Sequence, residues 1–354
     1  MMLPKITLSP RLPPVTRLGI GSLTVSAMQR ALPPDEAAGV LAYAFDAGIN
    51  FVDTAQYYEN YPLLRRALKL CRDPDSVVVS TKTYAYSREL AVRAVEEARE
   101  ALGRDVIDCF LLHEQESYDT LRGHREALDT LLEYRERGVI RAVGASTHHV
   151  ALVRGLLRLA DEGLTVDLCH PLFNKAGIGI ADGTVDDMAS ALALLHERGV
   201  GIYGMKALGG GHLADSAEDA LRFVLDQPFI DALVVGMQSK AEVDANLRFL
   251  ESGSFSPEDR AALSHIHRTL HVEEYCEGCG ACVRRCASGA LSLVPAEEES
   301  DPSADFAGDF SAAFARDAGI ETAAPKLRAR PDDRKCVRCG YCTKVCPVFA
   351  LKIY

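Results

Sequence analysis

The sequence predicts a (β/α)8 TIM barrel, in the α/β class, followed by a small C-terminal α+β domain. Short apolar runs alternate with helix-period segments eight times over about 235 residues, which matches this barrel in number and size. The runs are too continuous to have a solvent-facing side, as is usual for parallel strands. A doubly wound open sheet is the alternative, but no GxGxxG motif follows the first strand. Two clustered cysteine runs mark the last 80 residues as a separate small domain.

Each expected strand is short and apolar, and a segment with helical period follows it. The expected strands are Leu18–Leu23, Asn50–Asp53, Val77–Thr81, Ile107–His113, Ile140–Ser146, Val166–His170, Gly201–Met205 and Ala232–Gly236. In the helical segment between Ser87 and Gly103, Ser87 is suited to the N-cap and Gly103 to the C-terminal stop. The lead before the first strand is rich in proline and fits a hairpin.

Composition favours a globular protein that binds neither nucleic acid nor a membrane. The chain has 39 Lys and Arg against 50 Asp and Glu, a formal charge of −11. Nucleic acids and anionic membranes attract concentrated Lys and Arg, so we expect neither as a partner. The N-terminus lacks the apolar core of a signal peptide, and no stretch of 18 apolar residues occurs. We therefore expect a cytoplasmic protein, in which clustered cysteines favour metal over disulfides.

Three successive expected strands end in ionisable side chains. These are Asp53, Lys82 and His113, and Tyr58 follows Asp53 by five residues. Because the carboxyl ends of barrel strands converge on one face, where active sites lie, we expect the four side chains to meet there. Singly, each could be a helix cap or a salt-bridge partner. Four suitable groups at neighbouring positions indicate a catalytic set.

These four groups suit proton donation to a carbonyl oxygen that is receiving a hydride. Tyrosine is a weak acid at neutral pH, with an ordinary pKa of about 10, so it needs a neighbouring cation. Lys82 supplies that charge and Asp53 keeps Lys82 protonated, while His113 orients the substrate oxygen.

The motifs around these residues resemble those of the aldo/keto reductase superfamily. They are NFVDTAQYY, VVVSTK, FLLH, RAVGAS, MKALGGG and VVGMQSKAEVDANL, in this order across roughly residues 15–250. The resemblance implies a (β/α)8 barrel with a catalytic tetrad at Asp53, Tyr58, Lys82 and His113. By its spacing from the aspartate, the family pattern selects Tyr58 rather than the adjacent Tyr57.

The same resemblance implies a nicotinamide cofactor, NAD(P)H, on this face of the barrel. Its expected contacts are Gly21, Ser22, Ser146, His170, Met205, Lys206, Leu208, Gly209, Gly210, Gly236, Gln238, Glu242 and Asn246. Consecutive glycines after a strand could form a simple tight turn. They also let backbone amides approach a pyrophosphate, which favours the cofactor interpretation.

Three positions depart from the usual family pattern. His170 stands where a glutamine often holds the carboxamide, and Met205 where an aromatic residue often stacks on the nicotinamide. Glu242 stands where a basic residue often recognises the adenosine 2′-phosphate. A carboxylate repels that phosphate but can bond a free ribose hydroxyl, so NADH is favoured over NADPH.

Each cysteine run has the spacing C-x2-C-x2-C-x3-C. The runs are Cys276, Cys279, Cys282, Cys286 and Cys336, Cys339, Cys342, Cys346. This is the bacterial ferredoxin spacing for two [4Fe-4S] clusters, in which the fourth cysteine of each run ligates the other cluster. We therefore expect Cys346 to complete the first set and Cys286 the second. Paired zinc sites and a purely structural role for the clusters are the alternatives.

We expect the barrel to span residues 1–251, a helical linker residues 252–275 and a ferredoxin-like domain residues 276–354. An acidic, alanine-rich insert covers about residues 295–325. Its composition is typical of weakly ordered segments. A short docking helix is the alternative, because phenylalanines recur every four residues at Phe306, Phe310 and Phe314.

Together these features predict an oxidoreductase that transfers a hydride between NAD(P)H and a small carbonyl or alcohol substrate. The clusters would exchange electrons with a redox partner protein or with the site. Nicotinamide moves two electrons together, whereas each cluster moves one, and no flavin motif is evident. One alternative is an enzyme whose barrel binds substrate without nicotinamide, and whose clusters drive one-electron reduction or reductive elimination. Another is an electron-transfer or docking protein without turnover, against which the complete tetrad argues.

Overall fold

The computed structural model describes residues 3–29, 32–263, 269–296 and 326–353 of the chain. The chain divides into two compact units. The first comprises residues 1–268 with 337–339, and the second comprises residues 269–336 with 340–353. The barrel belongs to the first unit, and most of both cysteine runs belong to the second.

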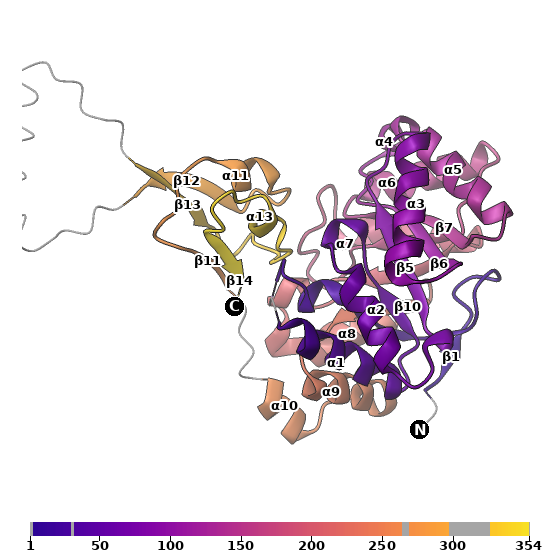
Figure 1. The fold of residues 1–354 in the computed structure, drawn as a ribbon, viewed down its shortest axis with the longest axis horizontal. Coiled ribbons are helices and arrows are strands. Elements are labelled where there is room, and N and C mark those ends of the chain that lie inside the picture. The colour runs from indigo at the N-terminus through magenta and orange to yellow at the C-terminus, as the bar shows by residue number, and fades with distance from the viewer. Residues whose placement is uncertain (1–2, 30–31, 264–268, 297–325, 354) are drawn as a thin grey trace, which may run out of the picture. The chain divides into compact units, whose positions relative to one another are not determined.

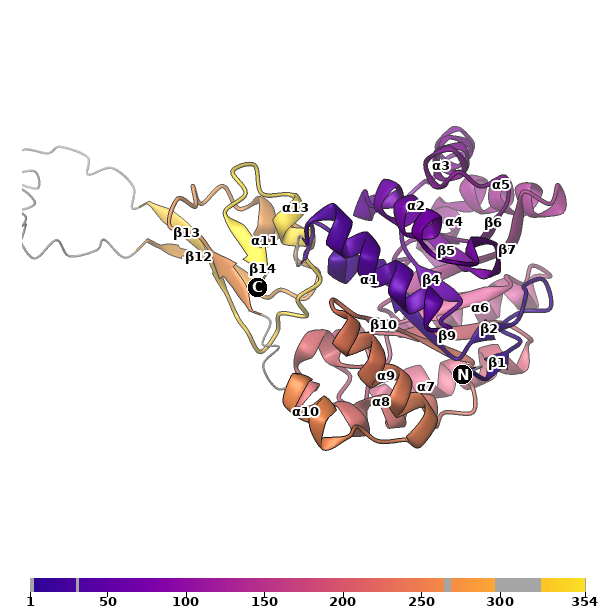
Figure 2. The same ribbon diagram turned by 60° about the horizontal axis from the view of Figure 1, so that its bottom comes forward.

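The first unit contains a closed barrel of eight parallel strands (Figure 1 and Figure 2). They are β3 (Leu18–Gly21), β4 (Phe51–Asp53), β5 (Val78–Thr83), β6 (Ile107–Leu112), β7 (Ile140–Thr147), β8 (Leu168–Pro171), β9 (Gly201–Met205) and β10 (Ala232–Gly236). The strands follow chain order around the barrel, and β10 closes it by pairing with both β9 and β3. This confirms the predicted barrel against the open sheet. Every predicted strand is present, with ends that differ by at most two residues.

Helices surround the strands (Figure 1). They are α1 (Pro34–Asp46), α2 (Tyr61–Leu70), α3 (Arg88–Leu102), α4 (Tyr118–Gly123), α5 (Arg125–Glu136), α6 (Val150–Asp161), α7 (Val185–Glu197), α8 (Ala217–Leu225) and α9 (Lys240–Ser252). The ends of α3 lie as predicted, because the Ser87 hydroxyl accepts from the Leu90 N–H at 3.3 Å. Gly103 follows with φ of 68°, a left-handed angle that glycine adopts at little cost.

Two apolar layers hold the barrel together. The outer layer lies between strands and helices and includes Val79 and Leu112. The inner layer fills the lumen with side chains such as Phe51, Leu111 and Leu168. Neighbouring residues of one strand alternate between the layers because strand side chains point to opposite faces. The lumen is therefore packed, and chemistry has room only at the ends of the barrel.

The N-terminal hairpin packs against the end of the barrel at which the strands begin. Strands β1 (Lys5–Ile6) and β2 (Val15–Thr16) pair antiparallel, as the proline-rich lead predicted. Leu8 lies between them and is buried with the inner layer. Its carbonyl oxygen lies only 1.8 Å from where a Cβ on Gly201 would stand. A glycine is therefore required where β9 begins, because the hairpin backbone approaches so closely.

Every second strand of the barrel begins at or beside an Asn or Asp. The side chain of this residue accepts a hydrogen bond from a backbone N–H of the preceding barrel strand or, for Asn50, of the N-terminal hairpin. The acceptors and donating N–H groups, 2.7–2.9 Å apart, are Asn50 with Thr16, Asp108 with Val79, Asp167 with Val143, and Asp231 with Ile202. These bonds hold neighbouring strands in register at this end. The ionisable side chains of the candidate site lie at the opposite end of the barrel, where the strands finish.

Where the structure describes it, at residues 269–296 and 326–353, the second unit contains two small antiparallel sheets and two short helices. Strand β11 (Leu270–Val272) pairs with β14 (Leu351–Ile353), and β12 (Leu291–Pro295) pairs with β13 (Leu327–Pro331). Helices α11 (Ala281–Arg285) and α13 (Tyr341–Lys344) each lie within a cysteine run. This arrangement is the predicted ferredoxin-like α+β domain.

The segment expected to be a helical linker is helical only in part. Helix α10 (Pro257–Leu263) lies within it, but Leu270–Val272 forms strand β11. The reason is local, because Leu270 and Val272 are buried while His271 between them is exposed, the alternation of a strand. Almost all of the expected acidic insert lies outside the described residues, including Phe306, Phe310 and Phe314.

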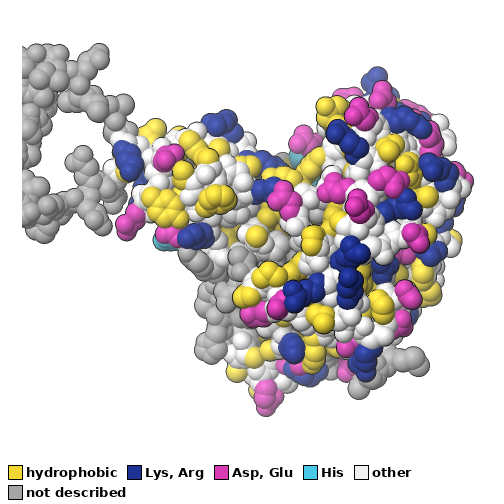
Figure 3. Space-filling view, viewed as in Figure 1, with side chains coloured by type: hydrophobic (Ala, Val, Ile, Leu, Met, Phe, Trp, Pro, Cys, Tyr) yellow, Lys and Arg dark blue, Asp and Glu magenta, His cyan; other side chains and the backbone are white. Residues whose placement is uncertain are grey.

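The surface of the barrel mixes charges of both signs. On the face drawn in Figure 3, Lys and Arg side chains lie among Asp and Glu side chains. Arg88 and Glu133, for example, form an exposed ion pair at 2.6 Å. Such pairs contribute little to stability, so the fold depends on its core. Among the described residues, no helix combines the length and apolar character that crossing a membrane requires.

Candidate active site and iron–sulfur centres

Asp53 and Lys82 form a buried ion pair at the ends of β4 and β5. Lys82 Nζ lies 2.6 Å from Asp53 Oδ2 and donates a second hydrogen bond to the Thr54 carbonyl at 2.7 Å. The side chain of Lys82 is 1% exposed and that of Asp53 is 7% exposed. A charge buried this deeply needs an opposite charge and hydrogen bonds to be stable. Each residue of the pair therefore depends on the other.

Tyr58 and His113 lie beside this pair. Tyr58 ends the short 3-10 helix η2 (Gln56–Tyr58), and its ring centroid is 5.3 Å from Lys82 Nζ. The ring of His113, directly after β6, meets the Tyr58 ring edge to face with centroids 5.7 Å apart. The structure thus brings together the four side chains that the sequence placed at successive strand ends.

Burial changes the proton affinity of the two basic groups. It lowers the pKa of Lys82 from its ordinary value, and the Asp53 carboxylate opposes that shift through charge attraction and a hydrogen bond. Burial also lowers the pKa of His113 well below its ordinary value. The His113 imidazole is therefore neutral at pH 7, and one of its nitrogens carries a hydrogen that can be donated to an oxygen.

A chain of polar side chains next to His113 was not anticipated from the sequence. Tyr84 stacks on His113 with ring centroids 4.5 Å apart and donates a hydrogen bond to Glu114. Glu114 Oε1 lies 3.7 Å from His148 Nδ1, and His148 Nε2 lies 3.2 Å from Lys206 Nζ. Because these residues follow β5, β6, β7 and β9, the chain crosses the mouth of the barrel. It fixes the Tyr84 ring against His113 and so orients the imidazole.

Several positions expected to contact a cofactor meet at the ends of β3 and β10. Gly21 and Gly236 pair directly in the parallel ladder. Ser22 follows Gly21 and is fully buried, while the Gln238 amide donates to the Thr24 carbonyl at 3.0 Å. A Cβ on Gly236 would lie 2.1 Å from the Thr24 side chain. The glycine thus allows the loop after β3 to lie against the end of β10.

Glu242 lies in the first turn of α9, where it helps to cap the helix. Its carboxylate accepts from the Gln238 backbone N–H at 3.3 Å. The Ser239 hydroxyl in turn accepts from the Glu242 N–H at 3.2 Å, and Asn246 donates to the Glu242 carbonyl at 2.8 Å. A negative charge is favourable at a helix N-terminus. Glu242 therefore has a structural reason to be acidic besides the cofactor preference that the resemblance implies.

The loop that follows Met205, the last residue of β9, has an unusual backbone. Lys206, Gly209 and Gly210 have φ angles of 59°, 57° and 71°. Glycine adopts such angles readily, whereas a residue with a Cβ pays about 1 kcal/mol or more. Leu208 packs against the outer core and anchors the loop. Within the loop, the N–H groups of Gly209 and Gly211 donate to the carbonyl oxygens of Lys206 and Leu208 at 2.8 and 2.9 Å, so the loop is a series of tight turns.

Ser146 and His170 lie near the ends of β7 and β8. Their side chains contact other groups of the protein. The Ser146 hydroxyl accepts from the Glu114 N–H at 2.9 Å. His170 Nδ1 donates to the Tyr203 carbonyl at 2.6 Å, and His170 Nε2 lies 3.7 Å from Asp53 Oδ1. Both ring nitrogens of His170 are therefore directed at groups of the barrel.

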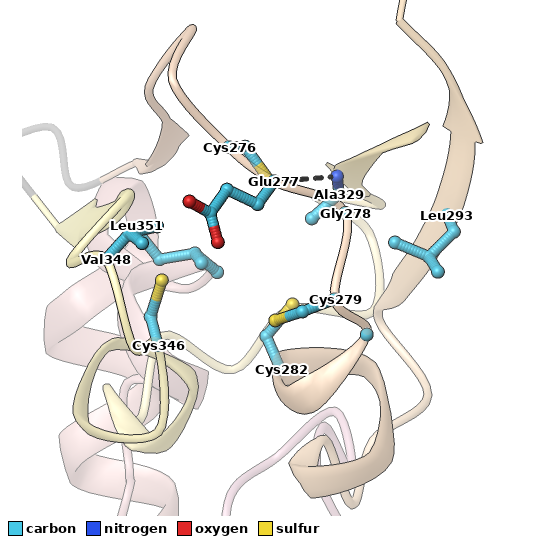
Figure 4. Close-up of a pocket in the computed structure, with 11 residues that line it drawn as sticks. Cys276, Glu277, Gly278, Cys279, Cys282, Leu293, Ala329, Cys346, Val348 and Leu351 are labelled. Atoms are coloured by element: carbon cyan, nitrogen blue, oxygen red, sulfur yellow. Dashed lines mark hydrogen bonds between the residues drawn. The ribbon is translucent and has the colours of Figure 1, made fainter. Parts of the chain in front are cut away.

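Four cysteines surround one pocket in the second unit (Figure 4). They are Cys276, Cys279, Cys282 and Cys346. Figure 4 shows the sulfur atoms of Cys279, Cys282 and Cys346 directed into the pocket. Three cysteines from the first run and one from the second form the set that the spacing predicts for one cluster. Four thiolates are the usual donor set of a [4Fe-4S] cluster, so the residues fit that group.

Backbone N–H groups point at the sulfur atoms of Cys276, Cys286 and Cys346. The pairs, from nitrogen to Sγ, are Ala329 to Cys276 at 3.5 Å, Ala350 to Cys346 at 3.1 Å and Ala290 to Cys286 at 3.3 Å. The last two donors each lie four residues after the fourth cysteine of a run, so the two runs share this local geometry. Hydrogen bonds to sulfur tune the reduction potential of a cluster. Of the remaining predicted ligands, Cys336 and Cys342 are buried and Cys339 is partly buried.

Comparison with known proteins agrees with this architecture. A family model described as the aldo/keto reductase family matches residues 17–219, more than half of the chain. The chain belongs to the aldo/keto reductase family. A second model, described as a 4Fe-4S dicluster domain, matches residues 275–350. This reductase is therefore an oxidoreductase that carries a C-terminal iron–sulfur domain, as predicted.

Named relatives of the reductase include two sugar dehydrogenases. L-galactose dehydrogenase from Arabidopsis thaliana is 23% identical over 296 residues, covering 72% of this chain and 91% of the relative. D-threo-aldose 1-dehydrogenase from Pseudomonas sp. is 32% identical over 182 residues, covering 42% of this chain and 55% of the relative. A solved structure from Pseudomonas aeruginosa, assigned as an aldo-keto reductase, is 24% identical with a TM-score of 0.59. It covers 70% of this chain and 95% of its own, and at this identity it shows the fold alone.

Replacing Cys279 with serine is expected to remove the cluster of the pocket. The variant should retain about half of the iron of the unmodified reductase, because the second set of cysteines is untouched. The control is Cys71→Ser, since Cys71 is buried in the barrel core and belongs to neither run. Iron and sulfide per chain, measured after anaerobic reconstitution, check the prediction. A full iron content in Cys279→Ser would show that this cysteine is not a ligand.

The buried His170 should make the stability of the reductase fall in mild acid. Burial lowers the pKa of His170 to about 4, so between pH 6.5 and 4 the unfolded chain binds a proton that the folded chain does not. Unfolding free energy should therefore fall by about 2 kcal/mol from pH 7 to pH 5 on account of this residue. In His170→Gln, this part of the pH dependence of the unfolding free energy should vanish. Urea denaturation followed by circular dichroism at several pH values measures it, and an unchanged slope would contradict the assignment.

Proposed function

We propose that the barrel mouth catalyses reversible hydride transfer between NAD(P)H and a small carbonyl or alcohol substrate, with Tyr58 as the proton donor. The observation that carries the proposal is the buried Lys82–Asp53 pair, 2.6 Å apart, next to the Tyr58 ring. A phenol becomes a useful acid at neutral pH only beside a fixed positive charge. The family assignment and the dehydrogenase relatives support the same chemistry.

The proposed roles follow from the environment of each side chain. Bound nicotinamide supplies the hydride to the carbonyl carbon. Tyr58 gives its proton to the carbonyl oxygen, and the Lys82 ammonium stabilises the tyrosinate that forms. Asp53 keeps Lys82 charged in spite of its burial. Neutral His113 donates a hydrogen bond to the same oxygen and so places it next to Tyr58.

Glu242 supports a preference for NADH within this proposal. Its carboxylate is buried at the start of α9, close to Gln238 and Asn246. A second negative charge brought there on a 2′-phosphate would be repelled and poorly solvated. A free 2′-hydroxyl can instead donate a hydrogen bond to the carboxylate.

The second part of the proposal concerns the iron–sulfur domain. We propose that Cys276, Cys279, Cys282 and Cys346 hold one [4Fe-4S] cluster, and that Cys286 completes the other set. Such clusters would supply one-electron exchange with a redox partner protein. The pocket of four thiols and the N–H groups aimed at sulfur support this assignment. Thiolate clusters persist in a reducing compartment, so we place the enzyme in the cytoplasm.

One observation favours a second candidate function, in which the barrel binds substrate without nicotinamide and the clusters supply electrons one at a time. His170 stands where the family often holds the carboxamide, yet both of its ring nitrogens face barrel groups. In that case Tyr58 and His113 act as acid and base during a one-electron reduction or a reductive elimination. The supply of single electrons also matches the chemistry of the clusters.

Titration with each nicotinamide distinguishes the two candidates. The anaerobically reconstituted reductase is expected to bind NADH about ten-fold more tightly than NADPH, because of the charge on Glu242. Nicotinamide fluorescence reports binding, and the visible absorption of the clusters reports their reduction. Hydride transfer to a panel of aldehydes, ketones and sugars completes the test. Absence of binding by either nucleotide, together with oxidation of reduced clusters by a substrate, would establish the second function instead.

Tyr58→Phe is expected to lower turnover by about 10²–10⁴-fold, because only the proton donor is removed. Iron content should stay the same, since Tyr58 belongs to the barrel. The matched control is Tyr57→Phe, because the Tyr57 ring makes an edge contact with Tyr84, with centroids 5.6 Å apart, and the change keeps that ring. Steady-state kinetics on one carbonyl substrate provide the measurement. Turnover retained in Tyr58→Phe, or lost equally in both variants, would contradict the proposed acid.

A further inference from the structure

Tyr203 is a buried polar side chain in the lumen of the barrel. It lies on β9 between Ile202 and Gly204, is completely buried, and belongs to the inner layer with apolar side chains such as Phe51 and Leu111. Its hydroxyl lies 2.7 Å from the Ser80 hydroxyl on β5 and 3.5 Å from Asp53 Oδ1. A phenol is placed in a packed core only where its hydroxyl finds partners. Here one partner is the carboxylate that holds Lys82.

The ring of Tyr203 is held on more than one side. His170 stacks on it with centroids 4.0 Å apart and planes inclined by 15°. Phe51 meets it edge to face with centroids 5.2 Å apart. His170 Nδ1 also donates to the Tyr203 carbonyl at 2.6 Å. A side chain confined in this way keeps its hydroxyl in one place, directly below the ion pair.

The hydrogen-bond directions around Tyr203 can be assigned from the chemistry of the groups. A carboxylate only accepts, so Tyr203 donates to Asp53 Oδ1. The Tyr203 hydroxyl has one hydrogen, so Ser80 must donate to the Tyr203 oxygen. Burial and the negative charge of Asp53 raise the pKa of Tyr203 well above its ordinary value, which keeps that hydrogen in place. The result is a directed chain from Ser80 through Tyr203 to Asp53.

The two oxygens of Asp53 therefore have different partners. Lys82 Nζ binds Oδ2, on the side of the barrel mouth where Tyr58 lies. Tyr203 binds Oδ1, and His170 Nε2 is 3.7 Å from the same oxygen. The further charged or titratable groups that influence this cluster are Cys109, His113 and Glu114. Of all these contacts, the Tyr203 hydroxyl is the one that donates to the oxygen left unused by Lys82.

We propose that Tyr203 is a positioning residue for catalysis, whose hydroxyl, backed by Ser80, holds the Asp53 carboxylate in its orientation toward Lys82. It acts through Asp53 and Lys82 on the acid Tyr58 and touches no substrate. This inference rests on the proposed role of the tetrad in proton donation. Hydrogen bonds to a carboxylate favour its charged form, and that form is what keeps Lys82 protonated in its buried site.

Tyr203→Phe removes the hydroxyl and keeps the ring contacts. The carbon-13 NMR resonance of the Asp53 carboxyl at pH 7, assigned with Asp53→Asn, is expected to shift because the carboxylate loses a hydrogen-bond donor. The kcat should fall by about 3- to 10-fold, with KM little changed. The double variant Ser80→Ala/Tyr203→Phe removes both partners and leaves no unsatisfied hydroxyl, so it tests the same point if the single variant folds poorly.

Tyr61→Phe is the matched control. Tyr61 is also a buried tyrosine, and its hydroxyl lies 2.7 Å from that of Thr81, the residue after Ser80 on β5. Its ring belongs to the outer layer, so the change removes a similar hydrogen bond without touching Asp53. The carboxyl resonance of Asp53 should stay as in the unmodified reductase. An equal shift in Tyr61→Phe, or none in Tyr203→Phe, would overturn the proposal.

The two readouts separate this inference from the proposed function. The carboxyl resonance needs neither substrate nor nicotinamide, so it decides whether Tyr203 supports Asp53 even if Tyr58→Phe retains turnover. A shifted carboxyl resonance with an unchanged kcat would overturn the catalytic role of Tyr203. A shifted resonance together with a lowered kcat, with Tyr58→Phe inactive, supports the whole chain from Ser80 to Tyr58.

Discussion

The buried ion pair between Lys82 and Asp53 is the interaction on which the candidate site depends. Burial alone would favour a neutral lysine, and the carboxylate at 2.6 Å opposes that tendency. The pair is costly to bury, so it persists only because the ends of β4 and β5 are held in register by the barrel. The layered core and the Asn and Asp side chains at the opposite end supply that rigidity. The end of the barrel where the strands begin thus contributes to stability, and the end where they finish carries the candidate site.

The sequence allowed much of this arrangement to be predicted, for a topological reason. Parallel strands of a barrel finish on one face, so Asp53, Lys82 and His113 at successive strand ends had to lie near one another. The cysteine spacing likewise implied which residues share a pocket. Neither inference required knowledge of any side-chain conformation.

Other parts of the site could not be read in this way. Tyr203 reaches Asp53 across the lumen, and such contacts depend on strand tilt and stagger rather than on distance along the chain. Glu114 and Lys206 have φ angles of 44° and 59°, which the local sequence gives no reason to expect of residues with a Cβ. The one available signal was a tyrosine at an inward position of a strand, in a lumen with many apolar side chains.

The pairing of β12 with β13 has a consequence for how the iron–sulfur domain tolerates change. Pro295 is paired with Leu327, so the ladder itself holds together the two strands between which the chain connects. The entropy of closing a chain between two paired strands grows only with the logarithm of the number of residues between them. Length variation between β12 and β13 is therefore thermodynamically cheap, because the strand pairing beside the thiol pocket does not depend on it. In evolutionary terms, the connection between β12 and β13 is a place where the chain can gain or lose sequence while the cysteine ligands keep their positions.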